Sequence, residues 1–410
     1  MADSPDVVIV GAGVAGAAMA IVLARQGRAV LMLEKSTRHI DRVRGESIVP
    51  WGVAEARALG LLDILLAAGG HFANKLVLYG EFIDPVVAQQ RAIPISALIP
   101  GIGGNLKLGH PAICQALDNA AEAAGARLLR GVSGVSVTPG APPAVSFRHD
   151  GATVKLKPRL VIAADGRGSA IAKQIGAAVE TDPLHHIFGG LLIDECPQWP
   201  AEVMVTGTEG RGTFYIFPQG RGRIRLYYAY GAERRREFNG ENGPANMLAA
   251  FRLATVPGSE WVAAARPAGP CHGFSNADTW IDRPYAPGVV LIGDAAGHND
   301  PTIGQGISIA FRDVRLVSDA LAAHDRWTPE IFEPYAAERR RRMARLRVTA
   351  QQFSKYRCEY TEAARAKRRQ AAARLAKDPS LGTPFRAVLL GPDLLPPEAY
   401  EPAIWQRLFE

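Results

Sequence analysis

The chain has 410 residues, of which 48% are hydrophobic, with 47 Lys and Arg against 40 Asp and Glu. This composition excludes an intrinsically disordered protein, and the length allows two intertwined domains with a large core. The net charge of +7 comes with no recognised nucleic-acid module, so we expect no nucleic-acid partner. No apolar run of about eighteen residues and no signal-peptide pattern occur, so we expect no transmembrane segment.

The four cysteines, Cys114, Cys196, Cys271 and Cys358, form no Cys-x-x-Cys pair and no zinc spacing. Free thiols are typical of a reducing compartment. The sequence therefore predicts a cytoplasmic protein without a metal site.

The first predicted elements are a strand, a glycine-rich turn, a helix and a second strand. The run DVVIV at 6–10 is typical of a strand buried on both faces. The turn GAGVAG at 11–16 opens a helix of small residues that stops at Gly27. A second strand at 29–33 ends at Glu34. This order is the dinucleotide-binding fingerprint, which by itself fits FAD and NAD equally well.

Each glycine of this turn has an expected role. Gly11 allows the tight turn, Gly13 lets the backbone approach a pyrophosphate, and Gly16 lets the helix pack closely on the strand. Glu34 is placed to accept hydrogen bonds from the ribose of adenosine. The alternative interpretation is a glycine-rich turn that holds no ligand.

The middle of the chain alternates between two kinds of pattern. Residues 1–70 and 100–180 are predicted to form nucleotide-binding layers, with a helix at 111–124 and strands near 127–137 and 159–164. The segment between these layers, 72–96, alternates as exposed strands do.

From 186 to 281, four alternating segments are separated by Gly-rich turns, which indicates an inserted antiparallel sheet. The chain then re-enters the nucleotide-binding fold at 288 and ends with helices from about 330. We therefore expect an α/β fold with a Rossmann-like nucleotide-binding domain, an inserted β-sheet substrate domain and C-terminal helices. The expected boundaries are 1–70, 100–180 and 282–330 for the nucleotide-binding domain, 71–99 and 181–281 for the sheet domain, and 331–410 for the helical region.

A second glycine motif follows the last predicted strand, at 291–306 (LIGDAAGHNDPTIGQG). Asp294 ends that strand and can accept hydrogen bonds from a polyol such as the ribityl chain of a flavin. The helix that begins near Gly306 would direct its positive end at a reduced flavin. Glycine motifs at both ends of the chain suggest one long ligand, FAD. An ordinary strand-to-helix connection with a capping Asp is the alternative.

Together these segments resemble the FAD-dependent monooxygenases of the para-hydroxybenzoate hydroxylase type, the single-component aromatic hydroxylases. The resemblance extends over roughly residues 5–320, and it adds AADGRGSAIAKQIG at 163–176 and RGESIVPW at 44–51 to the two glycine motifs. It implies that FAD is held by Gly11, Gly13, Val14, Ala15, Gly16, Glu34, Lys35, Arg44, His110, Asp165, Gly166, Gly293, Asp294, Pro301, Gly304, Gln305, Gly306 and Ile307.

The resemblance also implies a reaction. NADPH or NADH would reduce the flavin transiently, oxygen would add as a flavin C4a-hydroperoxide, and one oxygen atom would pass to an electron-rich aromatic or polycyclic small molecule. No catalytic acid or base is assigned; Asp300, Pro301 and Tyr215 are the candidates at the flavin edge. His185 and His186 are interpreted as an exposed or structural pair.

Three departures from the family pattern leave the substrate and detailed mechanism open. Gly297 stands where the family usually has His, with His298 next, and Asp300 stands where many members have a proline. His110 stands where the family often has Arg.

Other functions remain open at this point. An epoxidase, a halogenase or a double-bond reductase would share the fold, although the Trp-x-Trp-x-Ile-Pro signature of halogenases is absent. A flavin-binding adaptor without catalysis is a further alternative. The arginine-rich segments 338–347 and 364–377 are expected to be helices with solvated faces, or else docking faces for an acidic carrier protein, a CoA-type substrate or the NADPH phosphate. The oligomeric state is left open.

Overall fold

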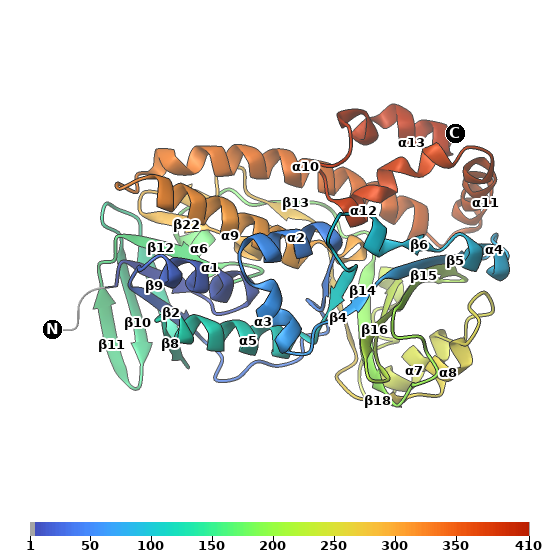
Figure 1. Cartoon of the computed structure of the whole chain (residues 1–410), viewed down its shortest axis with the longest axis horizontal. Coiled ribbons are helices and arrows are strands. Elements are labelled where there is room, and N and C mark those ends of the chain that lie inside the picture. Colours follow the sequence, from blue (N-terminus) through green and yellow to red (C-terminus); the bar gives the residue numbers. More distant parts are fainter. Residues whose placement is uncertain (1–4, 410) are drawn as a thin grey trace.

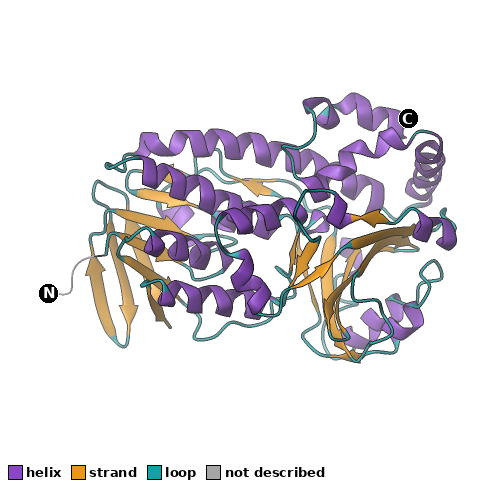
Figure 2. Cartoon of the chain, in the orientation of Figure 1, coloured by secondary structure: helices purple, strands orange, loops and turns teal. Residues whose placement is uncertain are grey.

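The computed structural model describes residues 5–409, which are organised around two large β-sheets (Figure 1). Figure 2 shows strands gathered toward the two ends of the molecule, with helices between and above them. The expected fold class is confirmed: a Rossmann-like α/β part, an inserted and mainly antiparallel sheet, and C-terminal helices.

The first sheet consists of β1 (Val7–Val10), β2 (Val30–Glu34), β8 (Arg127–Arg130), β12 (Leu160–Ala163), β21 (Tyr285–Ala286) and β22 (Val289–Leu291). Their order is β21-β22-β12-β1-β2-β8, and all neighbours are parallel except β21 with β22. In the centre, Val8 of β1 lies opposite Val161 on one side and Leu31 on the other. A central parallel strand is covered on both faces, which explains its uninterrupted apolar sequence.

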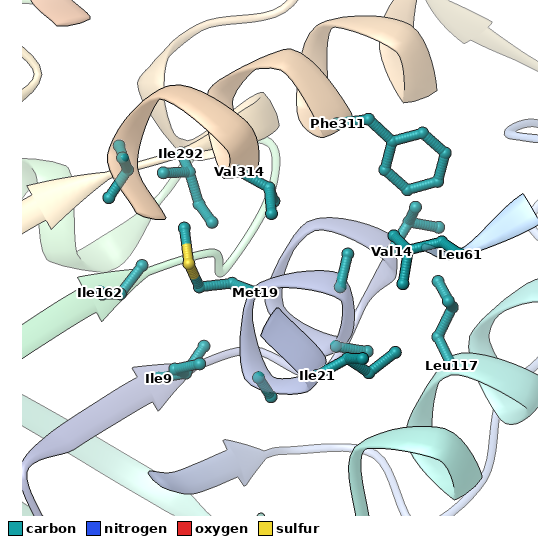
Figure 3. Packing of buried hydrophobic residues seen from close by; sticks show 14 of the residues in the cluster. Ile9, Val14, Met19, Ile21, Leu61, Leu117, Ile162, Ile292, Phe311 and Val314 are labelled. Carbon is teal, nitrogen blue, oxygen red and sulfur yellow. The ribbon is translucent and has the colours of Figure 1, made fainter. Parts of the chain in front are cut away.

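Three helices cover one face of this sheet: α1 (Val14–Arg25), α5 (His110–Ala123) and α9 (Gly306–Ala323). Figure 3 shows α1 between the strands that carry Ile9 and Ile162 and the helices that carry Leu117 and Phe311. The other face is covered by the antiparallel strands β9 (Ser133–Thr138), β10 (Ala144–His149) and β11 (Ala152–Leu156) and by α6 (Ala170–Gln174). The sheet thus has a hydrophobic core on each side.

The second sheet has eight strands: β5 (Lys75–Gly80), β6 (Ile93–Pro94), β14 (Ile187–Asp194), β15 (Val203–Glu209), β16 (Gly212–Gly220), β17 (Arg223–Tyr230), β18 (Arg266–Pro267) and β19 (His272–Ser275). Only the β5–β15 pair is parallel. One face packs on α7 (Gly243–Ala250) and α8 (Ser259–Ala263), where Phe214 and Tyr228 are buried. The opposite face carries Phe188, Tyr215 and Tyr227.

Short elements join the two sheets: β3 (Ser47–Ile48), α2 (Pro50–Ala58), α3 (Leu62–Ala67), β4 (His71–Ala73), β7 (Asn105–Lys107), β13 (Glu180–Thr181) and β20 (Thr279–Trp280). The C-terminal helices are α10 (Glu333–Arg357), α11 (Glu362–Lys377), α12 (Ala387–Leu390) and α13 (Pro402–Phe409). Helix α10 runs beside α9 and continues to the second sheet, so it contacts both parts of the molecule (Figure 1).

The structure corrects several local predictions. Residues Pro85–Gln90, expected to be strand, form helix α4, which begins with Pro85 and is capped by the side chain of Asp84. Strand β5 is largely buried rather than exposed, because β15 and β6 pair with it on either side. The strand expected near 127–137 is two strands in different sheets. The proline-rich segment 392–402 is mostly irregular and includes a short 3-10 helix at Pro397–Tyr400.

Candidate functional site

One cavity of about 1370 Å³ is lined by residues of the three motifs at 11–16, 163–176 and 291–306, and it extends under the C-terminal helices. Of the residues predicted to bind the cofactor, all line this cavity except Gly16 and Gly293. These two glycines support the cavity wall from behind. A Cβ on Gly16 would lie 1.9 Å from the carbonyl oxygen of Gly11, so only glycine allows α1 to approach β1 this closely.

The first glycine motif opens the N-terminus of α1 into the cavity. Gly13 is the N-cap, no side chain caps the helix, and the first turn holds no acidic residue. A Cβ on Gly13 would meet no atom of the described chain within 4 Å. An uncapped helix N-terminus beside open space carries partial positive charge, which suits a pyrophosphate.

Glu34 ends β2 at the cavity wall and is 9% exposed. Its Oε2 accepts the N–H of Ala12 at 2.9 Å and its Oε1 accepts the N–H of Ser36 at 2.8 Å. These bonds fix the carboxylate, and each oxygen retains a lone pair that can accept a ribose hydroxyl.

In the second motif, Asp165 is used to begin helix α6. Its Oδ1 accepts the hydroxyl of Ser169 at 2.6 Å, and its Oδ2 accepts the N–H of Ala170 at 2.8 Å. The neighbouring Gly166 and Arg167 also line the cavity. Arg167, which sequence analysis did not select, lies with its Nε 3.5 Å from Oδ2 of Asp294 and so joins the second motif to the third.

The third motif is two short 3-10 helices, Gly293–Ala296 and Pro301–Ile303, that lead into α9. The turn between them contains Gly297, whose φ is 112°. A Cβ there would lie 2.5 Å from the carbonyl oxygen of Thr279. The replacement of the family's usual His by glycine is therefore a steric requirement of this loop.

A buried ion cluster holds this Gly-Asp loop from behind. Asp313 of α9 accepts the N–H of Gly293 at 2.9 Å and pairs with Arg339 at 3.1 Å and Arg342 at 2.7 Å. Both arginines belong to α10 and are at most 2% exposed. The expectation of a solvated face for segment 338–347 is therefore wrong for these two residues.

The Arg44-Gly45-Glu46 segment is fixed to the second sheet. Arg225 of β17 donates to Glu46 through Nε at 2.6 Å and Nη2 at 2.8 Å, and the Tyr227 hydroxyl donates to Oε2 of Glu46 at 3.1 Å. All three side chains are buried. Sequence analysis missed Arg225; its only signal is an arginine between the apolar residues Ile224 and Leu226 of the strand.

Arg44 and His110 line the cavity next to this segment. The Nδ1 of His110 lies 3.3 Å from the carbonyl oxygen of Gly45. Burial lowers the pKa of His110 to about 4, so its ring is neutral near pH 7. The position where the family often has Arg therefore carries no charge here.

Asp300 does not line the cavity, whereas Pro301 next to it does. Oδ1 of Asp300 accepts the amide of Asn276 at 3.0 Å and both the N–H and the hydroxyl of Thr302 at 2.9 and 2.8 Å. Its Oδ2 accepts the hydroxyl of Ser354 at 3.1 Å. The carboxylate is thus occupied by protein donors.

Two further titratable groups surround Asp300. Burial lowers the pKa of His186 to about 4, so this ring is neutral near pH 7. Of the two interpretations of the histidine pair, exposed or structural, the structural one fits His186. Asp278 accepts the N–H of Asp300 at 2.9 Å. Burial, reinforced by the charge of Asp300, raises the pKa of Asp278 to about 7.

The far half of the cavity is aromatic. Because side chains alternate along a strand, Phe188, Tyr215 and Phe217 line the cavity while Phe214 and Tyr228 are buried on the other face. The Tyr215 hydroxyl is buried without a hydrogen-bond partner among the described residues. The remaining aromatic residues that line this half are Tyr227, Phe353, Tyr356 and Phe385.

The described residues 5–409 contain no helix long and apolar enough to cross a membrane. Within the same residues, no three His, Cys, Asp or Glu side chains are grouped as a metal site would need. The groups present fit FAD instead. They are a helix N-terminus with open space at Gly13, a fixed carboxylate at Glu34, and the carboxylate of Asp294 on the wall of the same cavity.

Comparisons with known proteins agree with this fit. The family described as FAD binding domain (FAD_binding_3) matches residues 4–350. Digeranylgeranylglycerophospholipid reductase 1 of Methanococcoides burtonii is 27% identical over 339 residues, covering 79% of this chain and 75% of that protein. Rifampicin monooxygenase of Streptomyces venezuelae is 27% identical over 360 residues, covering 82% of this chain and 68% of that protein.

Among solved structures, p-nitrophenol 4-monooxygenase from Pseudomonas putida DLL-E4 has the same fold, with a TM-score of 0.79 at 16% identity over 96% of this chain and 100% of that one. The resemblance to the single-component flavin monooxygenases is thereby confirmed. The chain belongs to the FAD binding domain family and is a flavin-dependent enzyme of the monooxygenase and oxidoreductase group.

Proposed function

We propose that the protein is an FAD-dependent monooxygenase that uses NADPH or NADH and O₂ to hydroxylate an electron-rich aromatic or polycyclic small molecule. The observation that carries this proposal is the continuity of the cavity. One volume of about 1370 Å³ joins the nucleotide motifs to a half lined by aromatic side chains from the second sheet and the C-terminal helices. A substrate in the aromatic half would lie beside a flavin held by the motifs.

The chain's own residues would bind and orient the cofactor. The N-termini of α1 and α9 would stabilise the pyrophosphate and the negative charge of the reduced flavin. Glu34 would accept the ribose hydroxyls, and Asp294, held near Arg167, would accept those of the ribityl chain. When bound, FAD supplies the chemistry of accepting a hydride and transferring one oxygen atom from O₂.

The aromatic half would exclude water and hold the substrate flat. The ring of Tyr215 packs against those of Phe188 and Phe217, with ring centres 5.5 and 5.7 Å apart. Pro301 and Tyr215 stay candidates for contact with the reacting atoms because both line the cavity. Asp300 would act only through its neighbours, and we assign no catalytic acid or base.

A double-bond reductase is the second candidate. It is favoured by the similarity to the M. burtonii enzyme, whose name describes reduction of a geranylgeranyl lipid, together with the apolar lining from Leu76, Leu78 and Met204. The two functions differ in the fate of O₂, since only the oxygenase places an oxygen atom in the product.

The first test is the absorbance spectrum of the purified protein before and after anaerobic addition of NADPH or NADH. Flavin bands that bleach with a nicotinamide and return with air, with peroxide released when no substrate is present, would support the oxygenase. Incorporation of ¹⁸O from ¹⁸O₂ into a product would separate it from the reductase. A protein that FAD cannot reconstitute would contradict the proposal.

The proposal includes the domain division stated above, with 1–70, 100–180 and 282–330 binding FAD, 71–99 and 181–281 forming the substrate sheet, and 331–410 the helical region. It also places the protein in the cytoplasm, which the four free cysteines support. An acidic carrier protein or a CoA-type substrate remains a prediction for the arginine-rich segments 338–347 and 364–377, except at Arg339 and Arg342, which are occupied by Asp313.

A further inference from the structure

The face of the second sheet that lines the cavity changes in character across the sheet. Its strands lie side by side in the order β14-β17-β16-β15-β5-β6. The first three strands contribute aromatic side chains to the cavity wall: Phe188, Tyr227, Tyr215 and Phe217. The next three contribute mainly aliphatic side chains: Met204, Leu76, Leu78 and Ile93. The wall therefore consists of an aromatic zone followed by an aliphatic zone.

The two zones belong to different hydrophobic clusters. The rings of the aromatic zone pack in one cluster with Phe353 of α10. The side chains of the aliphatic zone pack in another cluster, with Leu98 and with Leu389 of α12, and both of these residues line the cavity. Phe217 packs against both clusters and so marks the boundary. The division between the zones is thus present in the packing as well as in the strand order.

The aromatic zone adjoins the segment that we expect to contact the flavin. The hydroxyl of Tyr227 donates to Glu46 at 3.1 Å, and Arg44, two residues before Glu46, lines the cavity. The aliphatic zone lies on the side of α4 and α11 (Figure 1), and its rim carries Arg91, which is exposed. The cavity therefore passes from the nucleotide motifs along aromatic side chains, then along aliphatic ones, to an exposed rim.

The aliphatic zone is long enough for a chain of several carbon atoms. Neighbouring strands are about 4.8 Å apart, so the three steps from β16 to β6 span roughly 14 Å. Thr206 of β15 is a polar residue in this wall, and its hydroxyl accepts Nη1 of Arg357 at 3.3 Å. Along the leucine and methionine side chains, a buried polar group of a ligand would lack partners, whereas each buried methylene is stabilised.

The two zones suit different parts of one ligand. A flat ring is stabilised by offset or edge-to-face contacts with other rings, which the aromatic zone offers. Leucine and methionine side chains adapt to a flexible chain and offer it only apolar surface. A ligand with a ring at one end and a chain at the other would therefore match the order of the zones.

We propose that the substrate carries an aliphatic tail on its aromatic ring, with the ring in the aromatic zone and the tail along β15, β5 and β6 toward Arg91. This inference rests on the proposed function and narrows its substrate class. The tail would also orient the ring, because a chain buried along the aliphatic zone leaves the ring only the end of the cavity beside the nucleotide motifs.

The test is a calorimetric titration of the FAD-loaded protein at pH 7.5 with 4-ethylphenol, 4-butylphenol, 4-hexylphenol and 4-octylphenol. We expect the affinity to rise by roughly fourfold for each added methylene, the factor that burial of a methylene supplies. The probe 1-octanol has the same tail without the ring. It should bind roughly tenfold or more weakly than 4-octylphenol, because the aromatic zone would remain unfilled.

A substitution within the aliphatic zone tests where the tail lies. Leu78→Trp places a larger side chain in the middle of this zone. It should leave the affinity for 4-ethylphenol unchanged and reduce the ratio of octylphenol to ethylphenol affinity by tenfold or more. Leu78→Phe serves if the tryptophan variant does not fold. The matched control is Val86→Trp, which adds the same side chain at an exposed position of α4 outside the cavity lining and should keep the full ratio.

Three results would overturn the inference: an affinity that does not rise with tail length, an unchanged affinity ratio in Leu78→Trp, or 1-octanol binding as tightly as 4-octylphenol. The proposed function is judged separately, by nicotinamide oxidation and ¹⁸O incorporation in the wild-type protein. Dependence on tail length without nicotinamide oxidation would refute the oxygenase and leave the two-zone cavity standing. Oxygenation of short phenols without any dependence on tail length would do the reverse.

Discussion

Replacement of Arg339 by Met tests whether the buried ion cluster of α10 supports the cofactor loop. Arg339 donates to the carbonyl oxygens of Ala296 at 2.7 Å, Gly297 at 2.9 Å and Gly293 at 3.2 Å, and its Nε donates to Asp313 at 3.1 Å. Methionine fills much of the same volume but offers no donor. Three carbonyl groups of the Gly-Asp loop would lose this donor, and Oδ2 of Asp313 would keep only the N–H of Gly293.

The expected loss in the free energy of unfolding of Arg339→Met follows from two estimates. Four hydrogen bonds to a charged group, at about 1.5–3 kcal/mol each, set an upper bound of roughly 6–12 kcal/mol. Removing one partner of a buried ion pair costs about 3–5 kcal/mol in practice, and here Asp313 keeps its bond to Arg342. We therefore expect the free energy of unfolding to fall by about 3–5 kcal/mol, a large part of the 5–15 kcal/mol typical of a folded protein.

The assay is urea unfolding of the apoprotein followed by far-UV circular dichroism, together with an FAD titration of the folded variant. The control is Arg341→Met, because Arg341 is an exposed neighbour on the same helix. A loss below about 1 kcal/mol with unchanged FAD affinity would refute the reasoning, since the cluster would then neither stabilise the fold nor position the loop.

Three further changes test other parts of the site. Asp294→Ala should purify without FAD or bind it far more weakly, and a fully yellow protein would contradict the assignment to the ribityl chain. Glu34→Gln should weaken FAD binding by roughly tenfold or more, as measured by fluorescence titration, because a charged acceptor is worth about 1.5–3 kcal/mol; equal affinity would mean that Glu34 does not contact the ribose. Asp278 has a pKa raised by burial to about 7, so the folded state binds its proton more strongly than the unfolded state. Its contribution to stability is present below about pH 4 and is lost as pH rises through 7. Between these pH values, urea unfolding should therefore show a smaller fall in the free energy of unfolding for Asp278→Asn than for the wild-type protein.

The parts of the structure that follow from local sequence were predictable. The turn at 11–16 has its strand, its helix and Glu34 within about thirty residues, and each glycine of the turn has an expected role in the dinucleotide-binding fingerprint. The same holds for the Gly-Asp motif, which ends one strand and opens helix α9 within a single local segment.

The parts that depend on distant segments were not predictable in this way. Arg225 and Glu46 are 179 residues apart, and nothing near either residue indicates the other. Arg339 lies in a run of four arginines, where composition alone favours a solvated helix, and only the position of Asp313 on α9 reveals that it is buried. Helix α4 was missed for a local reason, since Asp84 and Pro85 are a standard helix start that an alternating apolar pattern obscured.

Helix α10 has a consequence for how substrate range can change within this architecture. Eighteen residues separate Arg339, which holds the cofactor loop, from Arg357, whose carbonyl is bonded to the second sheet. At about 1.5 Å per residue, one continuous helix fixes these two points roughly 27 Å apart. The spacing between the Gly293–Gly297 turn and the second sheet is therefore set by a single helix. Selection for larger or smaller substrates would therefore act through side chains that line the cavity, such as Leu375, Phe385 and Leu389, while the backbone of α10 stays in place.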